Sequence, residues 1–168
     1  KKELFEGLAI SHLEEDWEKY PVIRLDLSAY NPQIEGHIEM ILDTQLSRYE
    51  DIYGIPRPDI SHDQRLNRLI YSMSQKTGKG VVVLIDEYDA PLTAHISEPT
   101  MFEDRRNILR SVYSNLKSMD EYIKFVMLTG VTRYSETSVF SGLNNLEDIS
   151  TDHNYSTICG ITEVEIHE

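Results

Sequence analysis

The sequence predicts an α/β fold with a parallel sheet, and three observations support that prediction. Residues 81–85 form an unbroken apolar run that is rich in β-branched side chains and follows the turn signal Gly78-Lys79-Gly80. Such a run is typical of a strand that is buried on both faces of a parallel sheet. A second strand pattern occupies residues 124–128, where four apolar residues follow Lys124. Helical patterns separate the predicted strands, and this alternation indicates parallel strands joined by helical crossovers.

The sheet is expected to contain at least three strands. Residues 22–28 alternate between apolar and polar side chains, which places Arg24 and Asp26 on one face of the first strand. The strand at 81–85 should lie in the middle, and the last should cover residues 124–129. We expect helices to pack on both faces of this sheet.

Three helices are predicted between these strands. The clearest covers residues 37–53, and its apolar stripe is formed by Ile38, Ile41, Leu42, Leu46, Tyr49 and Ile52. The second covers residues 61–76 and begins with the capping-box pattern Ser61-x-x-Gln64. After a short proline-containing loop, a third helix is expected over residues 102–122.

Size and composition are ordinary for one soluble globular domain. The chain has 168 residues, of which 40% are hydrophobic and 27% charged. Its apolar runs are far shorter than the ~20 residues that span a bilayer, and its first residues lack the apolar core of a signal peptide. We therefore predict a cytoplasmic protein without a membrane partner. The single cysteine, Cys159, excludes an internal disulfide and a site built from several thiolates.

The charge of the chain argues against nucleic-acid binding. The formal net charge is −13, whereas affinity for a phosphate backbone depends on clustered lysines and arginines. The nearest basic cluster, Arg105, Arg106 and Arg110, lies within a helical pattern, where ion pairing on the surface is the simpler interpretation. We predict no direct binding of nucleic acid by this chain.

The central strand ends in the acidic residues Asp86 and Glu87. Ligands of open α/β sheets bind outside the carboxyl ends of the strands, so these carboxylates occupy the expected position of a site. Neighbouring strand residues point to opposite faces, which gives the two side chains different tasks. One could hold a metal ion through water, and the other could orient and deprotonate a water molecule.

Polar residues also follow the last strand. If this strand lies beside the central one, Thr129 and Arg133 fall near Asp86 and Glu87. The threonine hydroxyl could then help to position the water, and the arginine could stabilise phosphate charge. A simpler interpretation keeps Thr129 as a turn former and Arg133 as an ion-pair partner of the acidic residues.

Two separated segments carry a resemblance to a known family. The central strand with its two acids resembles the Walker B segment of P-loop ATPases. The segments VVVLIDEYDAPL and FVMLTGVTRYSETSVFSGLNNLEDIS together resemble the AAA-ATPase-like family abundant in gut bacteria, whose members usually carry a restriction-endonuclease-like domain at the C-terminus. Further similarity at KKELFEGLAI and STICGITEVEI extends the resemblance over nearly the whole chain.

The resemblance implies a fold and roles for matching residues. The fold would be a P-loop NTPase-like core with three α/β/α layers. Asp86 would organise Mg²⁺, Glu87 would activate the attacking water, and Thr129 would be the polar sensor of the adjacent strand. Arg133 belongs to the family pattern TG-x-[ST]-R. The cofactors implied are Mg²⁺ and ATP.

One departure from the family concerns the phosphate loop. The pattern G-x-x-x-x-G-K-[ST] does not occur in the sequence, and Gly78-Lys79-Gly80 lacks both its spacing and a following helix. The resemblance implies that the chain is a middle portion without the first strand, phosphate loop, first helix and lid. We therefore expect neither tight Mg-ATP binding nor hydrolysis by this portion alone. The last strand would also have a free edge, which favours self-association.

Two other functions remain open. The first is a nucleotide-dependent switch or protein-interaction module whose hydrolysis is weak or lost. The second is a metal-dependent nuclease that uses Asp26, Asp86, Glu87 and Asp89. The sequence disfavours the nuclease because no suitable lysine follows the acidic pair and because the domain is acidic.

Overall fold

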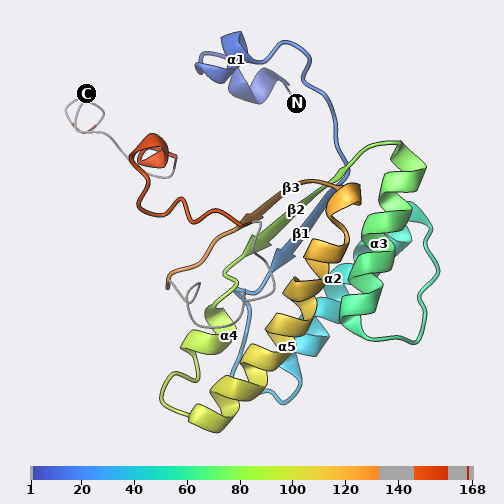
Figure 1. Ribbon diagram of the computed structural model, residues 1–168, viewed down its shortest axis with the longest axis vertical. Helices are drawn as coiled ribbons and strands as arrows, with labels where there is room; N and C mark the ends of the chain where they lie inside the picture. The colour runs from blue at the N-terminus through green and yellow to red at the C-terminus, as the bar shows by residue number, and fades with distance from the viewer. Residues whose placement is uncertain (1, 133–145, 159–165, 167–168) are drawn as a thin grey trace.

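The computed structural model, which describes residues 2–132, 146–158 and 166, contains a sheet of three parallel strands (Figure 1). The strands are β1 (Val22–Asp26), β2 (Val81–Asp86) and β3 (Ile123–Leu128). Their order is β1-β2-β3, and both neighbouring pairs are parallel. The predictions of an α/β fold, of parallel pairing and of a central position for the acidic strand are therefore confirmed.

Three long helices connect and cover the strands. They are α2 (His37–Tyr53), α3 (His62–Thr77) and α5 (Pro99–Ser118). The short elements are η1 (Lys2–Phe5), α1 (Ile10–Leu13), α4 (Ala90–Thr93), η2 (Asp120–Tyr122) and η4 (His153–Tyr155). Helix α2 has the predicted bounds, and α3 is displaced by a single residue from its predicted range.

Local chemistry explains where the predicted helix bounds were wrong. Helix α5 begins at Pro99 rather than at residue 102, because proline suits the first helical turn, where its missing N–H is not needed. The same preference makes Pro91 part of α4 instead of a loop. Ser61 precedes α3 as predicted, but its side chain makes no capping hydrogen bond. Ser61 is therefore the N-cap residue, but the side-chain hydrogen bond that defines a capping box is not formed.

One face of the sheet carries the core. Ile23, Leu25 and the β2 residues Val81, Val83 and Ile85 are each at most 1% exposed. They pack with a cluster of helical side chains that includes Ile38, Leu46, Leu66, Leu69, Ile70, Met73, Leu109, Val112, Tyr113 and Leu116. Helices α2, α3 and α5 all lie on this side (Figure 1).

The opposite face of the sheet is open within the described part of the chain. Val22 on β1 is 41% exposed, and Phe125 on β3 is 53% exposed. The prediction of helices on both faces, and with it the three-layer arrangement, is therefore wrong for the described residues, which form two layers. Burial along β2 alternates although every residue from 81 to 85 is apolar. An unbroken apolar run does not specify which element covers each face.

Helix α2 closes the outer edge of β1. The Gln45 side chain accepts a hydrogen bond from the Asp26 N–H at 2.8 Å and donates one to the Asp26 carbonyl at 2.6 Å. The Tyr49 hydroxyl accepts the Arg24 N–H at 2.7 Å. These side chains form hydrogen bonds with backbone groups of β1 that would otherwise be free to pair with a strand of another chain. Ile52, predicted on the buried stripe, is 63% exposed.

A buried ion pair joins α2 to α3. Arg65 is 6% exposed and Glu50 is 2% exposed, and two hydrogen bonds connect them, at 3.0 Å from Nε and at 2.6 Å from Nη2. Arg65 also donates to the Ser47 hydroxyl and contacts Asp43. The bonds to Glu50, followed by those to Asp43, raise the pKa of Arg65 against the opposing effect of burial. The carboxylates of Glu50 and Asp43 therefore favour the charged form of the buried Arg65.

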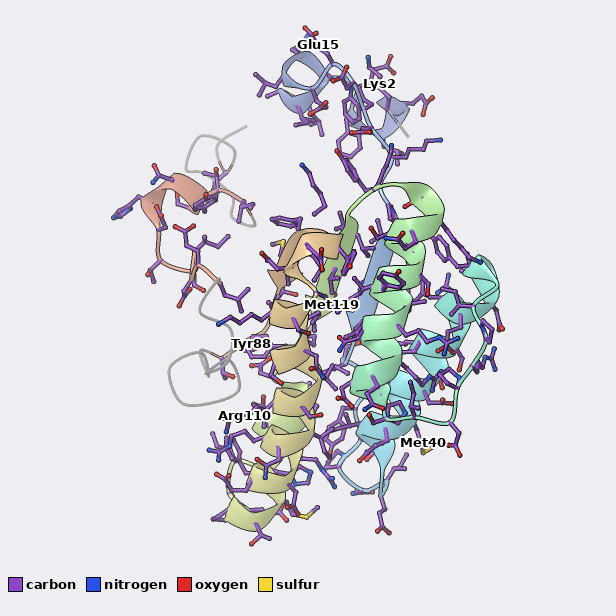
Figure 2. All side chains as sticks on the ribbon, turned by 45° about the vertical axis from the view of Figure 1, so that its right-hand side comes forward. Lys2, Glu15, Met40, Tyr88, Arg110 and Met119 are labelled. Carbon is purple, nitrogen blue, oxygen red and sulfur yellow. The ribbon has the colours of Figure 1, made fainter. Side chains whose placement is uncertain are left out.

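The first described residues form a separate segment above the sheet, marked by Lys2 and Glu15 at the top of Figure 2. Phe5 packs on Trp17 with ring centroids 5.0 Å apart, while Leu4 and Leu13 are 72% and 78% exposed. Within the described residues, no helix has both the length and the apolar character needed to span a membrane.

Candidate functional site

The acidic end of β2 meets side chains from both neighbouring strands. The Thr129 hydroxyl, directly after β3, donates to Asp86 Oδ1 at 2.6 Å. From β1, Arg24 Nη2 donates to Asp86 Oδ2 at 2.8 Å and to Asp26 Oδ2 at 2.9 Å. Asp26 is the register partner of Asp86. The structure thus brings Thr129 to Asp86, and Arg24 is an additional partner that the sequence analysis did not assign to the site.

Hydrogen bonds keep these carboxylates ionised. The Thr129 hydroxyl, and after it Arg24, lower the pKa of Asp86 below its ordinary value. The Ser28 hydroxyl and backbone N–H lower the pKa of Asp26. Because the two pKa values are depressed, both side chains are carboxylates at neutral pH.

These depressed pKa values predict a loss of stability in acid. A carboxylate whose pKa is lower in the folded state stabilises the fold above its unfolded pKa of ~3.9, and the effect is lost as pH falls through the folded pKa. We expect the free energy of unfolding to fall between about pH 5 and pH 2, and the fall should be shallower in Asp86→Asn. Both groups are substantially exposed, so the difference should be small.

Urea titrations at several pH values would measure this dependence. Glu35→Gln, which removes an exposed carboxylate outside the cluster, is the control and should keep the wild-type slope. An Asp86→Asn slope equal to that of wild type would contradict the prediction.

Glu87 has an unusual backbone conformation. Its φ is +52°, in the left-handed region that favours glycine. The neighbouring backbone holds it there, because the Tyr88 N–H donates to the Thr129 carbonyl at 3.0 Å and the Ala90 N–H donates to the Glu87 carbonyl at 3.0 Å. A non-glycine residue in this region is strained, and such strain often accompanies functional sites. The strain thus lies at the residue that the sequence analysis assigns to water activation.

Asp89 bonds the turn that follows β3. Its side chain is buried, and its Oδ2 accepts the Thr132 N–H at 2.6 Å as well as the Thr132 hydroxyl. Its Oδ1 accepts the Val131 N–H at 3.2 Å. We call residues 129–132 the sensor turn. Asp89 entered the sequence analysis only as a metal ligand of the nuclease alternative, and its contact with the sensor turn was missed.

Gly130 makes this close contact between Asp89 and the sensor turn geometrically feasible. A Cβ atom at this position would lie 2.7 Å from Tyr88 Cε1 and still closer to Asp89 Oδ1. Any other residue would therefore force the turn and the acidic segment apart. The Thr129-Gly130 dipeptide was the sequence signal for this contact.

The nuclease alternative finds no support in this arrangement. The Asp89 carboxylate is directed to residues 131 and 132, and the Asp86 carboxylate to Thr129 and Arg24. Across the described ranges, no three histidine, cysteine or acidic side chains converge as a metal site formed by protein side chains alone would require. Asp86 and Thr129 nevertheless supply hard oxygen atoms of the type that Mg²⁺ prefers when water and substrate complete its shell. These residues fit a shared metal site rather than a site formed by protein side chains alone.

Two residues of the sequence analysis lie outside the described part of the chain. They are Arg133, predicted near the acidic residues, and Cys159. The predicted role of Arg133 stays a prediction.

Comparisons with known proteins give one family match and one relative. A family model described as "Predicted AAA-ATPase" matches residues 1–140. A protein of Azotobacter chroococcum mcd 1, described as an uncharacterized protein in the vnfD 5' region, is 37% identical over 164 residues. The match covers 97% of this chain and 32% of that relative, so the chain spans about a third of the relative's length. No solved structure matches.

Proposed function

The chain belongs to the AAA-ATPase-like family, and from this premise we propose that it carries the Walker B acids and the sensor strand of an ATPase. Hydrolysis of Mg-ATP is expected in the complete protein, once a phosphate loop is supplied. The observation that carries the proposal is the 2.6 Å hydrogen bond from Thr129 to Asp86, which joins polar groups at the carboxyl ends of adjacent parallel strands. This is where ligands of open α/β sheets bind.

Each residue has a defined task in the proposed reaction. Asp86 would hold Mg²⁺ through water, and the ion, when bound, neutralises charge on the phosphates. Glu87 accepts a proton from the attacking water. Thr129 fixes one oxygen of Asp86 and offers its own oxygen to the water. Arg133 remains a proposed stabiliser of phosphate charge.

One observation favours the alternative of a switch with weak or lost hydrolysis. Arg24 donates to Asp86 Oδ2 at 2.8 Å, so its guanidinium lies where it competes with a cation for that oxygen. If the ion pair persists when nucleotide binds, Asp86 cannot organise Mg²⁺ fully. ATP would then be bound and sensed rather than turned over.

The proposal also concerns partners and location. The family match supports ATP as the proposed partner, and the charge of −13 argues against nucleic acid. A cytoplasmic location is a separate part of the proposal. Self-association through the outer edge of β3 is a further part, because no described segment pairs with that edge.

Asp86→Asn in the complete protein should weaken binding and turnover together. The substitution removes a charge from the proposed metal shell, so Mg²⁺-dependent ATP affinity and kcat should both fall. Nucleotide titrations with and without Mg²⁺, together with steady-state hydrolysis, would measure the two effects. Asp26→Asn is a matched control, because Asp26 is the register partner of Asp86 and shares Arg24 with it.

The control separates a metal role from a general loss of negative charge. Asp26→Asn should keep most of the Mg-ATP affinity. Equal losses in the two variants would contradict the assignment of Asp86. A complete wild-type protein that binds Mg-ATP without hydrolysing it would instead favour the switch.

A further inference from the structure

We propose that Asp89 is a positioning residue that fixes the sensor turn against the acidic end of β2 and thereby orients Glu87 and Thr129. This inference rests on the proposed ATPase function. It assigns a task to a buried carboxylate that takes no direct part in the proposed chemistry.

The first argument is the direction of the Asp89 side chain. Asp89 is the N-cap residue of α4, a position where an aspartate usually accepts an N–H from its own helix. Its carboxylate makes no such bond. Instead it accepts three hydrogen bonds from Val131 and Thr132, 42 and 43 residues away in the sequence. The carboxylate therefore serves the sensor turn rather than its own helix.

The second argument is that the bonds bracket Glu87. On one side, Asp86 accepts the Thr129 hydroxyl. On the other, the Tyr88 N–H donates to the Thr129 carbonyl at 3.0 Å, and the Tyr88 hydroxyl donates to the Thr132 carbonyl at 2.7 Å. Asp89 adds its three bonds to the same turn. Both chain neighbours of Glu87, Asp86 and Tyr88, thus hydrogen-bond the sensor turn. These bonds maintain the left-handed backbone of Glu87.

The third argument is burial. Asp89 is 1% exposed, so water does not compete for its carboxylate oxygens. A buried acceptor that is fully bonded holds its donors in one geometry, because any displacement leaves polar groups unpaired. Gly130 lets this carboxylate approach the turn without obstruction from a side chain.

Asp89→Asn in the complete protein tests the proposal. Asparagine has nearly the same shape, but its NH₂ group faces N–H and O–H donors and cannot accept from them. We expect kcat for ATP hydrolysis to fall by about 10²-fold, the cost of a small misplacement of reacting groups. The KM for ATP should stay nearly unchanged, because no proposed ligand of the nucleotide has been removed.

Two further variants make the test specific. Gly130→Ala pushes the turn away from the same carboxylate, so it should reproduce the effect, and the double variant should be little worse than either single one. Thr93→Val is the matched control, because Thr93 bonds the backbone carbonyl of Asp89 and not its carboxylate. Thr93→Val should retain wild-type kcat.

A purely structural role gives a different result. Asp89→Asn would then lower Tm, yet kcat per folded molecule, measured well below Tm, would equal that of wild type and overturn the proposal. Amide hydrogen exchange of the complete protein gives a readout independent of turnover. Exchange at residues 131 and 132 should accelerate in Asp89→Asn, and unchanged protection would also overturn the proposal.

The outcomes separate this inference from the proposed function. If wild type hydrolyses ATP, Glu87→Gln does not and Asp89→Asn matches wild type, only the role of Asp89 is wrong. If wild type does not hydrolyse ATP, the ATPase proposal is wrong, and hydrogen exchange at residues 131 and 132 alone decides whether Asp89 fixes the sensor turn.

Discussion

Replacing Glu87 by Gln in the complete protein should slow ATP hydrolysis by about 10²- to 10⁴-fold and leave Mg-ATP affinity nearly intact. Glutamine keeps the shape of the side chain and can still hydrogen-bond a water molecule. It cannot accept the proton that the water must lose as it attacks. The loss should therefore appear in kcat rather than in nucleotide binding.

Steady-state hydrolysis measured beside nucleotide titration would test this prediction. Glu35→Gln, the same chemical change at an exposed position, should have no effect on either quantity. Turnover of Glu87→Gln at the wild-type rate would show that Glu87 does not activate water. Glu87 would then be a solvated side chain, and another group would have to accept the proton.

Arg65→Met should lower the free energy of unfolding by about 3–5 kcal/mol, the usual cost of breaking a buried ion pair. The substitution leaves the Glu50 carboxyl group 2% exposed and without its two hydrogen bonds to the guanidinium. Arg57 Nε, 3.7 Å from Glu50 Oε2, is on a half-exposed side chain and can compensate only weakly. For a chain of this size the expected fall in Tm is about 10 °C.

Chemical and thermal unfolding would measure the effect, and two variants isolate its cause. Arg57→Met should cost less than about 1 kcal/mol, as exposed ion pairs do. Arg65→Met combined with Glu50→Leu should recover much of the loss, because the uncompensated buried charge is removed. A loss below about 1 kcal/mol in Arg65→Met would contradict the prediction.

The strands and helices could be predicted because their patterns are local. An apolar run at 81–85 and the stripe of α2 define a strand and a helix without reference to the rest of the chain. The covering of each sheet face could not be predicted, because Val82 and Val83 are chemically identical and differ only in what lies above them. Ile52 is exposed for the same reason: its position on the apolar stripe of α2 does not show whether another element covers the end of that helix.

The candidate site was predictable in part for a related reason. Asp86 and Thr129 end adjacent strands, and parallel pairing alone brings them together. The contact of Arg24 with Asp86 depends on the register of β1, which no local pattern specifies. No local pattern shows that the Asp89 carboxylate accepts hydrogen bonds from the turn after β3, because its partners Val131 and Thr132 are more than 40 residues away in the sequence.

The left-handed backbone at Glu87 has a consequence for sequence change over time. Glycine at this position would relieve strain of the order of 1 kcal/mol, so folding by itself favours replacement of the glutamate. In a lineage whose site no longer hydrolyses nucleotide, selection for activity would not oppose that replacement. We therefore expect glutamate at position 87 in family members that hydrolyse nucleotide, and glycine or asparagine in those that have lost hydrolysis.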